Sequence, residues 1–394
     1  MFAKRIDRLT SSLIREILAL TQKPEVISFA GGLPAREAMP PLDMTGLPAA
    51  MSQYGPSEGE PELREQIARY LDGVGVCCKP EQILITSGSQ QGLDLVSKLF
   101  VDKGTPVGVE APSYLAALQS FRLFGADFLE LGLTADGIDP EQLRKLIKQH
   151  KPALVYLIPS FQNPSGVCYS ESVRAAVAEL LVETGTPLLE DEPYRELVYD
   201  PVDRTPISAR LGDSTWMMMG TFSKTGIPGL RVGYLVASEN VFPYLVRLKQ
   251  CTDLHTNRIG QWWNAQYLAS PAFEQQLQQL RDFYRVRRDA MQDALEHHLG
   301  DLAQWNMPKG GLFFWLRLNQ DCDTRALLVK ALERNVAFMP GEPFFAYPPN
   351  RGSYMRLNFS HATPEQAERG LSILAEVIRE HLREHTRASA GMEI

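Results

Sequence analysis

The sequence predicts an α/β protein, with a large domain built on a mostly parallel central sheet and a smaller α+β domain. Two observations support this fold class. From Gln82 onward, short apolar strands alternate with turns and helical segments, which is typical of a parallel sheet with crossover helices. Near Ser270 this alternation stops, and 394 residues exceed the length that one compact core usually holds, so a second domain is expected to follow.

The N-terminal part is predicted to form one helix and one short strand. Leu9–Leu20 has the apolar spacing of an amphipathic helix, with two serines near its start as capping residues. Residues 26–30 are predicted to form a strand that opens onto a turn containing Gly31 and Gly32. Paired glycines allow the backbone to approach a ligand closely, and they also occur in ordinary turns, so both interpretations stay open.

Five apolar strands are predicted in the large sheet, and polar residues follow the end of each. The strands are Ile83–Thr86, Val107–Glu110, Ala153–Ile158, Pro187–Glu190 and Trp216–Met219. The polar residues beyond them are Ser87, Ser89, Gln90, Tyr114, Asn163, Asp191, Tyr194, Thr221, Ser223 and Lys224. Ligands of open α/β sheets bind at the carboxyl ends of the strands, so these side chains are expected to share one site. The alternative is that helix caps and turn formers collected there independently.

Lys224 lies in a hydroxyl-rich turn between two strands, and Arg231 follows seven residues later. Positive charge and partial burial lower the pKa of a lysine toward its neutral, nucleophilic form. Arg231 could supply that charge and a forked grip on a phosphate. Ser87–Gln90 opens a predicted helix, whose free N–H groups suit an anion, although an ordinary N-cap also explains the serines. A surface lysine in a turn is the alternative interpretation of Lys224.

The second domain is predicted to combine helices with a further set of strands. The helices are Phe273–Leu299, Thr324–Arg334 and Pro364–Glu384, and the strands lie within residues 308–318, 336–339 and 354–360. Arg356 stands among alternating apolar residues in the last strand, and a buried guanidinium needs an anionic partner. The strand itself offers none, so the partner is expected to be either a ligand carboxylate or a distant Asp or Glu.

Composition and charge limit the possible partners. A net charge of -7 without a basic block argues against nucleic acid, and no apolar run is long enough to span a bilayer, so cytoplasmic residence is expected. The five cysteines, scattered without metal-type spacing, predict reduced thiols rather than disulfides. His297 and His298 are predicted to end a helix rather than to bind a metal.

The motifs taken together resemble one enzyme family. They are T-S-G-S-Q-Q-G-L-D at residues 86–94, Tyr114, Asn163-Pro-Ser-Gly166, Asp191-x-x-Tyr194, Thr221-x-Ser223-Lys224, Arg231-x-Gly233-Tyr234 and Arg356-x-Asn358. In this order and spacing they are similar to fold-type I pyridoxal-phosphate aminotransferases, and in particular to the class I subgroup that holds 2-aminoadipate and kynurenine aminotransferases. The likeness extends from about Arg15 to the last strand, which is nearly the whole chain.

The resemblance implies pyridoxal 5'-phosphate as the cofactor and gives each motif a role. Lys224 would form the imine with the cofactor and then move a proton between substrate and cofactor. Asp191 would keep the ring nitrogen protonated, and Tyr114 would stack on the ring. Tyr194 and Asn163 would donate hydrogen bonds to the phenolic oxygen. The implied phosphate-binding residues are Ser87, Gly88, Ser89, Gln90, Thr221, Ser223 and Arg231.

The same resemblance implies where the substrate binds. Arg356 would hold the α-carboxylate in two hydrogen bonds, with Asn163 and Gly32 beside it. Arg15 matches an arginine that can bind a distal carboxylate of the substrate or turn away from an apolar substrate side chain. The alternative is a solvent-exposed arginine on a helix. Tyr54 matches a tyrosine that reaches a phosphate across the subunit boundary, which implies a homodimer with two shared sites.

The implied domains are residues 1–30, a segment that completes the small domain and covers the site, residues 31–270, the large cofactor-binding domain, and residues 271–394, the small domain. The implied activity is a ping-pong transfer of the amino group of an L-amino acid to 2-oxoglutarate or pyruvate. A β-lyase or decarboxylase is one alternative, because the same imine can break other bonds. A ligand-sensing domain of a regulator is another, although the chain before Gly31 is expected to be too short and not basic enough for the winged helix of such proteins.

Overall fold

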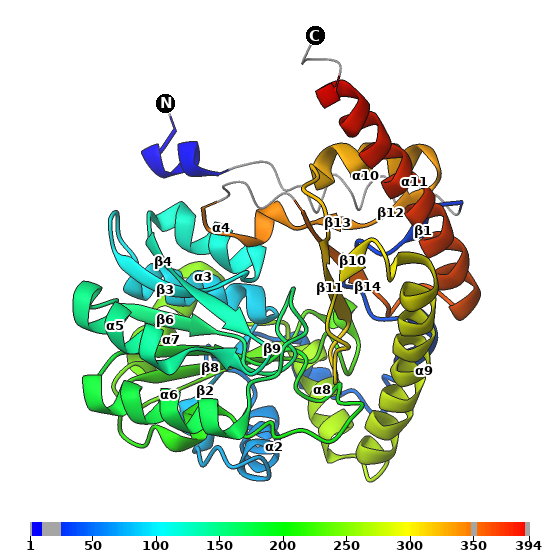
Figure 1. The fold of residues 1–394 in the computed structure, drawn as a ribbon. Helices are drawn as coiled ribbons and strands as arrows, with labels where there is room; N and C mark the ends of the chain where they lie inside the picture. The colour runs from blue at the N-terminus through cyan, green and yellow to red at the C-terminus, as the bar shows by residue number, and fades with distance from the viewer. Residues whose placement is uncertain (1, 10–24, 348–352, 391–394) are drawn as a thin grey trace.

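The computed structural model describes residues 2–9, 25–347 and 353–390, which contain three β-sheets with helices packed around them (Figure 1). Apart from Leu9, the predicted helix Leu9–Leu20, with Arg15, lies outside the described residues. Short 3-10 helices connect the longer elements. They are η1 (Lys4–Arg8), η2 (Arg36–Ala38), η3 (Ala49–Ser52), η4 (Pro80–Gln82), η5 (Ile207–Arg210), η6 (Pro228–Leu230) and η7 (Glu342–Phe344).

The largest sheet has eight strands in the order β2-β9-β8-β7-β6-β3-β4-β5. They are β2 (Ile83–Thr86), β3 (Pro106–Ala111), β4 (Asp127–Thr134), β5 (Gly137–Ile138), β6 (Leu154–Leu157), β7 (Leu188–Asp191), β8 (Trp216–Thr221) and β9 (Gly233–Ala237). The pairs that join β8, β7, β6, β3 and β4 are parallel, whereas β9 and β5 run antiparallel to their neighbours. The predicted α/β class with a mostly parallel sheet is confirmed.

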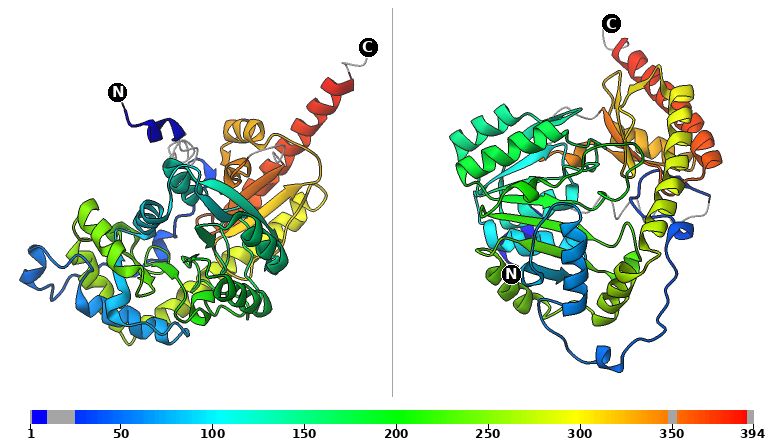
Figure 2. Two further views of the ribbon diagram at one scale, coloured as in Figure 1. Left: turned by 90° about the vertical axis from the view of Figure 1, so that its left-hand side faces the viewer. Right: turned by 90° about the horizontal axis from the view of Figure 1, so that it is seen from below.

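Helices cover both faces of this sheet (Figure 2). On one face the apolar core includes residues of α2 (Pro61–Asp72), α5 (Pro140–His150), α6 (Glu171–Thr184) and α8 (Arg258–Ala269). On the other face it includes residues of α3 (Ser89–Phe100), α4 (Leu115–Phe124) and α7 (Phe242–Thr252). Because both faces are covered, every residue of a central strand such as β6 is buried, which explains its continuous apolar sequence.

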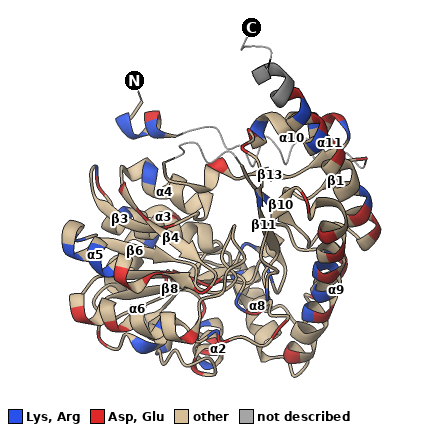
Figure 3. Ribbon diagram, viewed as in Figure 1, with Lys and Arg blue, Asp and Glu red and all other residues tan. Residues whose placement is uncertain are grey.

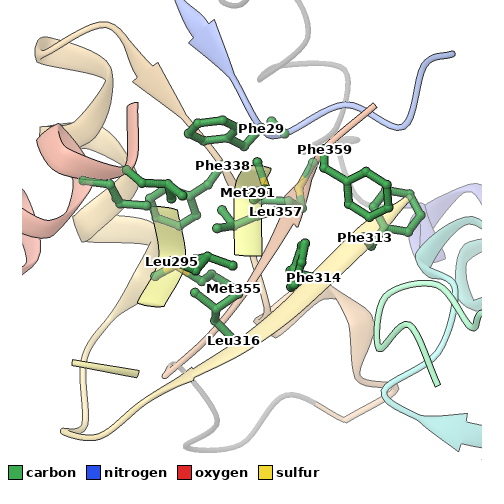
Figure 4. Packing of buried hydrophobic residues seen from close by; sticks show 14 of the residues in the cluster. Phe29, Met291, Leu295, Phe313, Phe314, Leu316, Phe338, Met355, Leu357 and Phe359 are labelled. Carbon is green, nitrogen blue, oxygen red and sulfur yellow. The ribbon is translucent and has the colours of Figure 1, made fainter. Parts of the chain in front are cut away.

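A second, antiparallel sheet has four strands in the order β10-β11-β14-β13. The strands are β10 (Ala303–Gln304), β11 (Phe313–Leu318), β13 (Met339–Pro340) and β14 (Tyr354–Asn358), and the helices packed around them are α9 (Phe273–Leu299), α10 (Thr324–Glu333) and α11 (Pro364–Ala390). Figure 4 shows Met291 and Leu295 of α9 in the same core as Leu316 and Met355 of the strands. The bounds of α9 match the predicted helix.

The predicted single strand at residues 336–339 is wrong. Residues Val336–Ala337 form β12, which pairs in parallel with β1 (Ile27–Ser28), whereas β13 pairs with β14 of the four-stranded sheet. Phe338, fully buried between β12 and β13, marks the point where the chain passes from one sheet to the other. Phe29 beside β1 packs in the same core, so the segment that leads into the large sheet is anchored here (Figure 4).

The segment between β1 and α2 is a long loop that projects beyond the helices, as both views in Figure 2 show. Leu33 and Leu42 of this loop are more than half exposed, and Tyr54 is 77% exposed. Arg258 of α8 holds the far end of the loop, because its guanidinium donates to the carbonyl oxygen of Tyr54 and pairs with Glu60. The loop is therefore fixed at its ends while apolar side chains between them face outward.

The outer surface mixes the two signs of charge, as Figure 3 shows along α5, α6 and α9. None of the described helices combines the length and the apolar character needed to cross a membrane. α9 ends at Leu299, so His297 and His298 close a helix as predicted. Glu368 of α11 lies 2.7 Å from His298, and the three side chains could hold a metal ion, a possibility that the sequence did not indicate.

Candidate active site

The carboxyl ends of β3, β6, β7 and β8 meet at one edge of the large sheet, because these strands are parallel neighbours. Tyr114, Asn163, Asp191 and Lys224 lie at or shortly after these four strand ends. β9 runs antiparallel to β8, so its amino end reaches the same edge and brings Arg231 there. Strand direction therefore gathers residues that are distant in the sequence.

A cavity of about 300 Å³ lies at this edge. Its lining consists of Ser89, Gln90, Tyr114, Ile158, Asn163, Asp191, Pro193, Tyr194, Thr221, Ser223, Lys224 and Arg231. Apart from Ile158 and Pro193, each of these is among the predicted site residues. Small-molecule sites have volumes from about 300 Å³ upward, so the cavity is large enough for a cofactor.

Lys224 follows β8 and lies half-buried in the cavity. Its Nζ donates to the carbonyl oxygen of Gly32 at 2.7 Å and stands 5.7 Å from the centre of the Tyr194 ring. Loss of hydration, together with the positive charges of Arg356 and Arg231, lowers the pKa of Lys224 to about 8. Part of the amine is therefore neutral near pH 7, as nucleophilic attack on an aldehyde requires.

Asp191, the last residue of β7, is buried, and its two carboxylate oxygens differ in their surroundings. Oδ2 accepts a hydrogen bond of 2.8 Å from the hydroxyl of Tyr156, whereas Oδ1 is buried without a hydrogen-bond partner among the described residues. Burial raises the pKa of Asp191 to about 7, and the hydrogen bond from Tyr156 opposes this shift. An unsatisfied buried carboxylate oxygen is costly, so Asp191 is suited to a cationic N–H group of a ligand.

Arg356 of β14 reaches the site from the four-stranded sheet. Its guanidinium donates to Oδ1 of Asn163 at 2.8 Å and to the carbonyl oxygen of Ala30 at 2.7 Å. It also lies 4.1 Å from the ring centre of Phe313 and 5.1 Å from that of Phe344. Burial lowers the pKa of Arg356 to about 10, which leaves the group charged at neutral pH.

The sequence left two partners open for this arginine, a ligand carboxylate and a distant acidic residue. Within the described part of the chain, no carboxylate forms an ion pair with Arg356, and its Nε is buried without a partner. A buried guanidinium without an anion is destabilising. Arg356 is therefore suited to bind the carboxylate of a ligand.

A third part of the site combines a helix N-terminus with hydroxyl and guanidinium groups. α3 begins at Ser89, and the first N–H groups of a helix have no partner within it. Gly88 precedes it with φ of +78°, and a Cβ atom there would lie 2.5 Å from the guanidinium of Arg231, so this position requires glycine. Arg231 lies 3.4 Å from the hydroxyl of Ser223, which is 3.0 Å from that of Thr221. These groups suit a phosphate.

Some predicted site residues lie outside the cavity lining. The Ser87 hydroxyl donates to Asp253 at 3.2 Å, and Asp253 forms an ion pair of 2.8 Å with the buried Lys249. Tyr54 is on the projecting loop, and Arg15 is outside the described residues. The roles assigned to these residues stay predictions.

The structure adds residues that sequence reasoning missed. Tyr156 of β6 contacts Asp191, and two phenylalanines enclose the Arg356 guanidinium. In the sequence Tyr156 resembles an ordinary core residue, because it lies inside an apolar strand. Phe313 and Phe344 belong to β11 and η7, so only the tertiary packing brings them to Arg356.

The profile of the family "Aminotransferase class I and II" matches residues 34–374. The chain belongs to this family. A 2-aminoadipate transaminase of Thermus thermophilus is 40% identical over 374 residues, which cover 92% of each chain. Aromatic-amino-acid aminotransferase 1 of Thermococcus litoralis is 36% identical, over 97% of this chain and 95% of its own. The crystal structure of LysN, an alpha-aminoadipate aminotransferase of T. thermophilus, complexed with N-(5'-phosphopyridoxyl)-L-leucine, is similar with a TM-score of 0.90 and 36% identity, over 97% of this chain and 98% of that one.

The protein is thus a fold-type I aminotransferase that uses pyridoxal 5'-phosphate, and the cavity fits this cofactor. The unsatisfied oxygen of Asp191 suits a protonated ring nitrogen, and the partly neutral Lys224 suits an aldehyde. The start of α3, with Arg231, suits the phosphate. When bound, the cofactor withdraws electrons from the bond that breaks at the substrate α-carbon.

The lowered pKa of Lys224 predicts how the apoenzyme takes up the cofactor. The amine is mostly protonated below pH 8 and mostly neutral above it, so the rate of covalent attachment should rise about tenfold from pH 7 to pH 9 and then level off. Rapid mixing, followed by the growth of the visible absorbance band, measures this rate. Arg356→Gln removes a positive charge and should move the midpoint to higher pH. A midpoint near the ordinary lysine value of 10.5 in the unchanged protein would contradict the assignment.

Proposed function

We propose that the cavity holds pyridoxal 5'-phosphate and an amino acid together. The observation that carries this proposal is that Lys224 and Asp191 line one cavity, Arg356 contacts its lining residue Asn163, and none of the three has an oppositely charged partner among the described residues. Proteins rarely bury such groups unpaired. The cofactor and an amino acid would supply what these groups lack, namely an aldehyde, a cationic ring nitrogen and a carboxylate.

Each residue then has a defined task. Arg356 binds the α-carboxylate of the substrate. Asn163, which accepts a hydrogen bond from Arg356, fixes the orientation of the guanidinium. With the cofactor and substrate bound, the Lys224 amine would move a proton between the α-carbon of the substrate and C4′ of the cofactor. Asp191 keeps the ring nitrogen protonated, and Tyr194 and the side-chain amide N–H of Asn163 donate to the phenolic oxygen. The phosphate is held by Gly88, Ser89, Gln90, Thr221, Ser223 and Arg231, and Tyr114 stacks on the ring.

The donor is proposed to be an L-amino acid and the acceptor 2-oxoglutarate or pyruvate. Two relatives are named for 2-aminoadipate and for aromatic amino acids, which supports an acidic or an aromatic donor. These donors differ in their side chains and share the α-carboxylate that Arg356 would bind. The substrate class therefore depends on the part of the site that receives the side chain.

A donor screen tests the proposed activity. Purified protein is mixed with each L-amino acid and either 2-oxoglutarate or pyruvate, and the products are quantified by mass spectrometry. We expect a new oxoacid and a new amino acid in equal amounts, with 2-aminoadipate or an aromatic amino acid among the best donors. Lys224→Ala, the matched control, should lack both the visible absorbance band and turnover. Release of ammonia or carbon dioxide instead would indicate a lyase or a decarboxylase, and ligand-induced spectral changes without turnover would indicate a sensor.

Removal of the Arg356 guanidinium should weaken substrate binding more than cofactor binding. Loss of one partner of a buried charged pair costs about 2–5 kcal/mol, so Arg356→Ala should raise the KM for the amino donor about thirtyfold or more. The visible absorbance band of the bound cofactor should remain. As a control, an amine that lacks the carboxylate should react equally with both proteins in single-turnover measurements. An unchanged KM for the amino acid would count against the role of Arg356.

We further propose the domain division and a homodimer. Residues 31–270 would form the large domain and residues 271–394 the small domain, with residues 1–30 completing the latter. The pairing of β1 with β12 supports the last assignment. The projecting loop that carries the exposed Tyr54 supports a second subunit, because a loop of this kind could pack on a partner and place Tyr54 near its cavity.

The proposed homodimer predicts a native mass of twice the 44.1 kDa of one chain, measured by light scattering after gel filtration.

If the Tyr54 hydroxyl reaches a phosphate, Tyr54→Phe should weaken cofactor binding about tenfold, the loss typical of a hydrogen bond to a charged group. The dimer should persist in this variant. Tyr244→Phe, which alters another exposed tyrosine, is the control and should bind the cofactor normally. A fully active monomer would refute the shared site.

A further inference from the structure

Asp191 depends on one other side chain for its position. Among the described residues, the hydroxyl of Tyr156 makes the only hydrogen bond to the Asp191 carboxylate, at 2.8 Å from Oδ2. The other oxygen, Oδ1, is left without a protein partner. The terminal torsion of an aspartate side chain is soft, so the carboxylate can rotate unless a hydrogen bond holds it. The orientation of Oδ1 is therefore set by the contact between Oδ2 and Tyr156.

Tyr156 is itself firmly held. It lies in β6, the strand next to β7, where it pairs with Leu189 on one side and Val109 on the other. Its side chain is fully buried, and its ring packs edge-on against Phe121 at 5.7 Å between ring centres. Burial and the negative charge of Asp191 raise the pKa of Tyr156 well above its usual value. The phenol therefore stays protonated and acts as a donor.

We propose that Tyr156 is a positioning residue, which acts through Asp191 to keep the carboxylate ionised and Oδ1 directed at the ring nitrogen of the cofactor. The inference rests on the proposed role of Asp191. Removal of the hydroxyl would leave both oxygens without a protein donor in a fully buried setting, and such a carboxylate is favoured in its neutral, protonated form. A neutral acid holds a protonated ring nitrogen poorly. We therefore expect Tyr156 removal to weaken binding of a cofactor that has the ring nitrogen and to spare one that lacks it.

The test compares Tyr156→Phe with the unchanged protein in binding two ligands to the apoenzyme. One ligand is pyridoxal 5'-phosphate, and the other is its carbocyclic analogue, in which carbon replaces the ring nitrogen. Spectroscopic titration gives the dissociation constant of each. Tyr156→Phe should weaken binding of pyridoxal 5'-phosphate about tenfold to a hundredfold, the range for loss of a hydrogen bond to a charged group. Binding of the carbocyclic analogue should change little, because it has no nitrogen for Asp191 to hold.

Further variants separate positioning from a loss of packing. Tyr169→Phe removes another fully buried phenol that donates to a buried carboxylate, at 2.7 Å from Glu110, and should leave the ratio of the two dissociation constants unchanged. Asp191→Asn should abolish the preference for the nitrogen-containing ligand, and adding Tyr156→Phe to it should have no further effect, since the tyrosine acts through the aspartate. If Tyr156→Phe fails to fold, Tyr156→Met removes the same hydroxyl with a more adaptable side chain.

The outcomes distinguish this inference from the proposed function. If the unchanged protein prefers pyridoxal 5'-phosphate over its carbocyclic analogue and Tyr156→Phe keeps that preference, the role of Tyr156 is refuted while the role of Asp191 stands. Equal weakening of both ligands in Tyr156→Phe also refutes it, because the effect would then be structural. If the unchanged protein binds both ligands equally, the role of Asp191 fails, and the inference about Tyr156 fails with it.

Discussion

The site depends on charged groups that are buried or half-buried before any ligand arrives. Lys224 and Asp191 lose hydration at one cavity and Arg356 loses it beside the lining residue Asn163, and the described protein gives none of them an opposite charge. Burial is unfavourable for each group alone, so the surrounding core must hold them in place. The groups that hold them are neutral, namely the carbonyl oxygen of Gly32 for Lys224, the phenol of Tyr156 for Asp191 and the amide of Asn163 for Arg356. Neutral partners orient the charges without cancelling them, which leaves the charges available to a ligand.

The fold meets this requirement by joining two sheets at one place. The parallel strands of the large sheet deliver Asn163, Asp191 and Lys224 to a common edge, and the antiparallel β9 returns Arg231 to it. β14 of the four-stranded sheet delivers Arg356, whose hydrogen bond to Asn163 links the two parts of the molecule. Arg356 comes from the four-stranded sheet, whereas Lys224 and Asp191 come from the large sheet. The relative placement of the two sheets therefore determines the geometry of the site.

Sequence reasoning predicted the parallel sheet and most of the cavity lining because both depend on local signals. Short apolar runs ending in Gly, Ser, Asn or Asp indicate strand ends, and the carboxyl ends of parallel strands lie at the same edge of the sheet. It could not predict Tyr156, since a tyrosine in an apolar strand is equally a core residue, and only the adjacent β7 places Asp191 against it. It also could not predict that the Ser87 hydroxyl donates to Asp253, a partner 166 positions away, so the phosphate-binding role of Ser87 stays a prediction. The switch of residues 336–339 between two sheets was missed for the same reason, because pairing partners far along the chain decide it.

The electrostatic coupling within the site links substrate binding to the chemistry of Lys224. The positive charge of Arg356 is one cause of the lowered pKa of Lys224, and it acts most strongly while Arg356 has no anion. A substrate carboxylate on Arg356 would offset that charge, and the pKa of Lys224 would then rise toward its ordinary value. A lysine with a lowered pKa is suited to attack the cofactor aldehyde. Once the amine is released in its neutral form, a higher pKa makes it a stronger acceptor for the α-proton of the substrate. Arg356 would therefore favour cofactor attachment before the substrate binds and proton transfer after it binds. The substrate carboxylate itself would change the charge that Lys224 experiences.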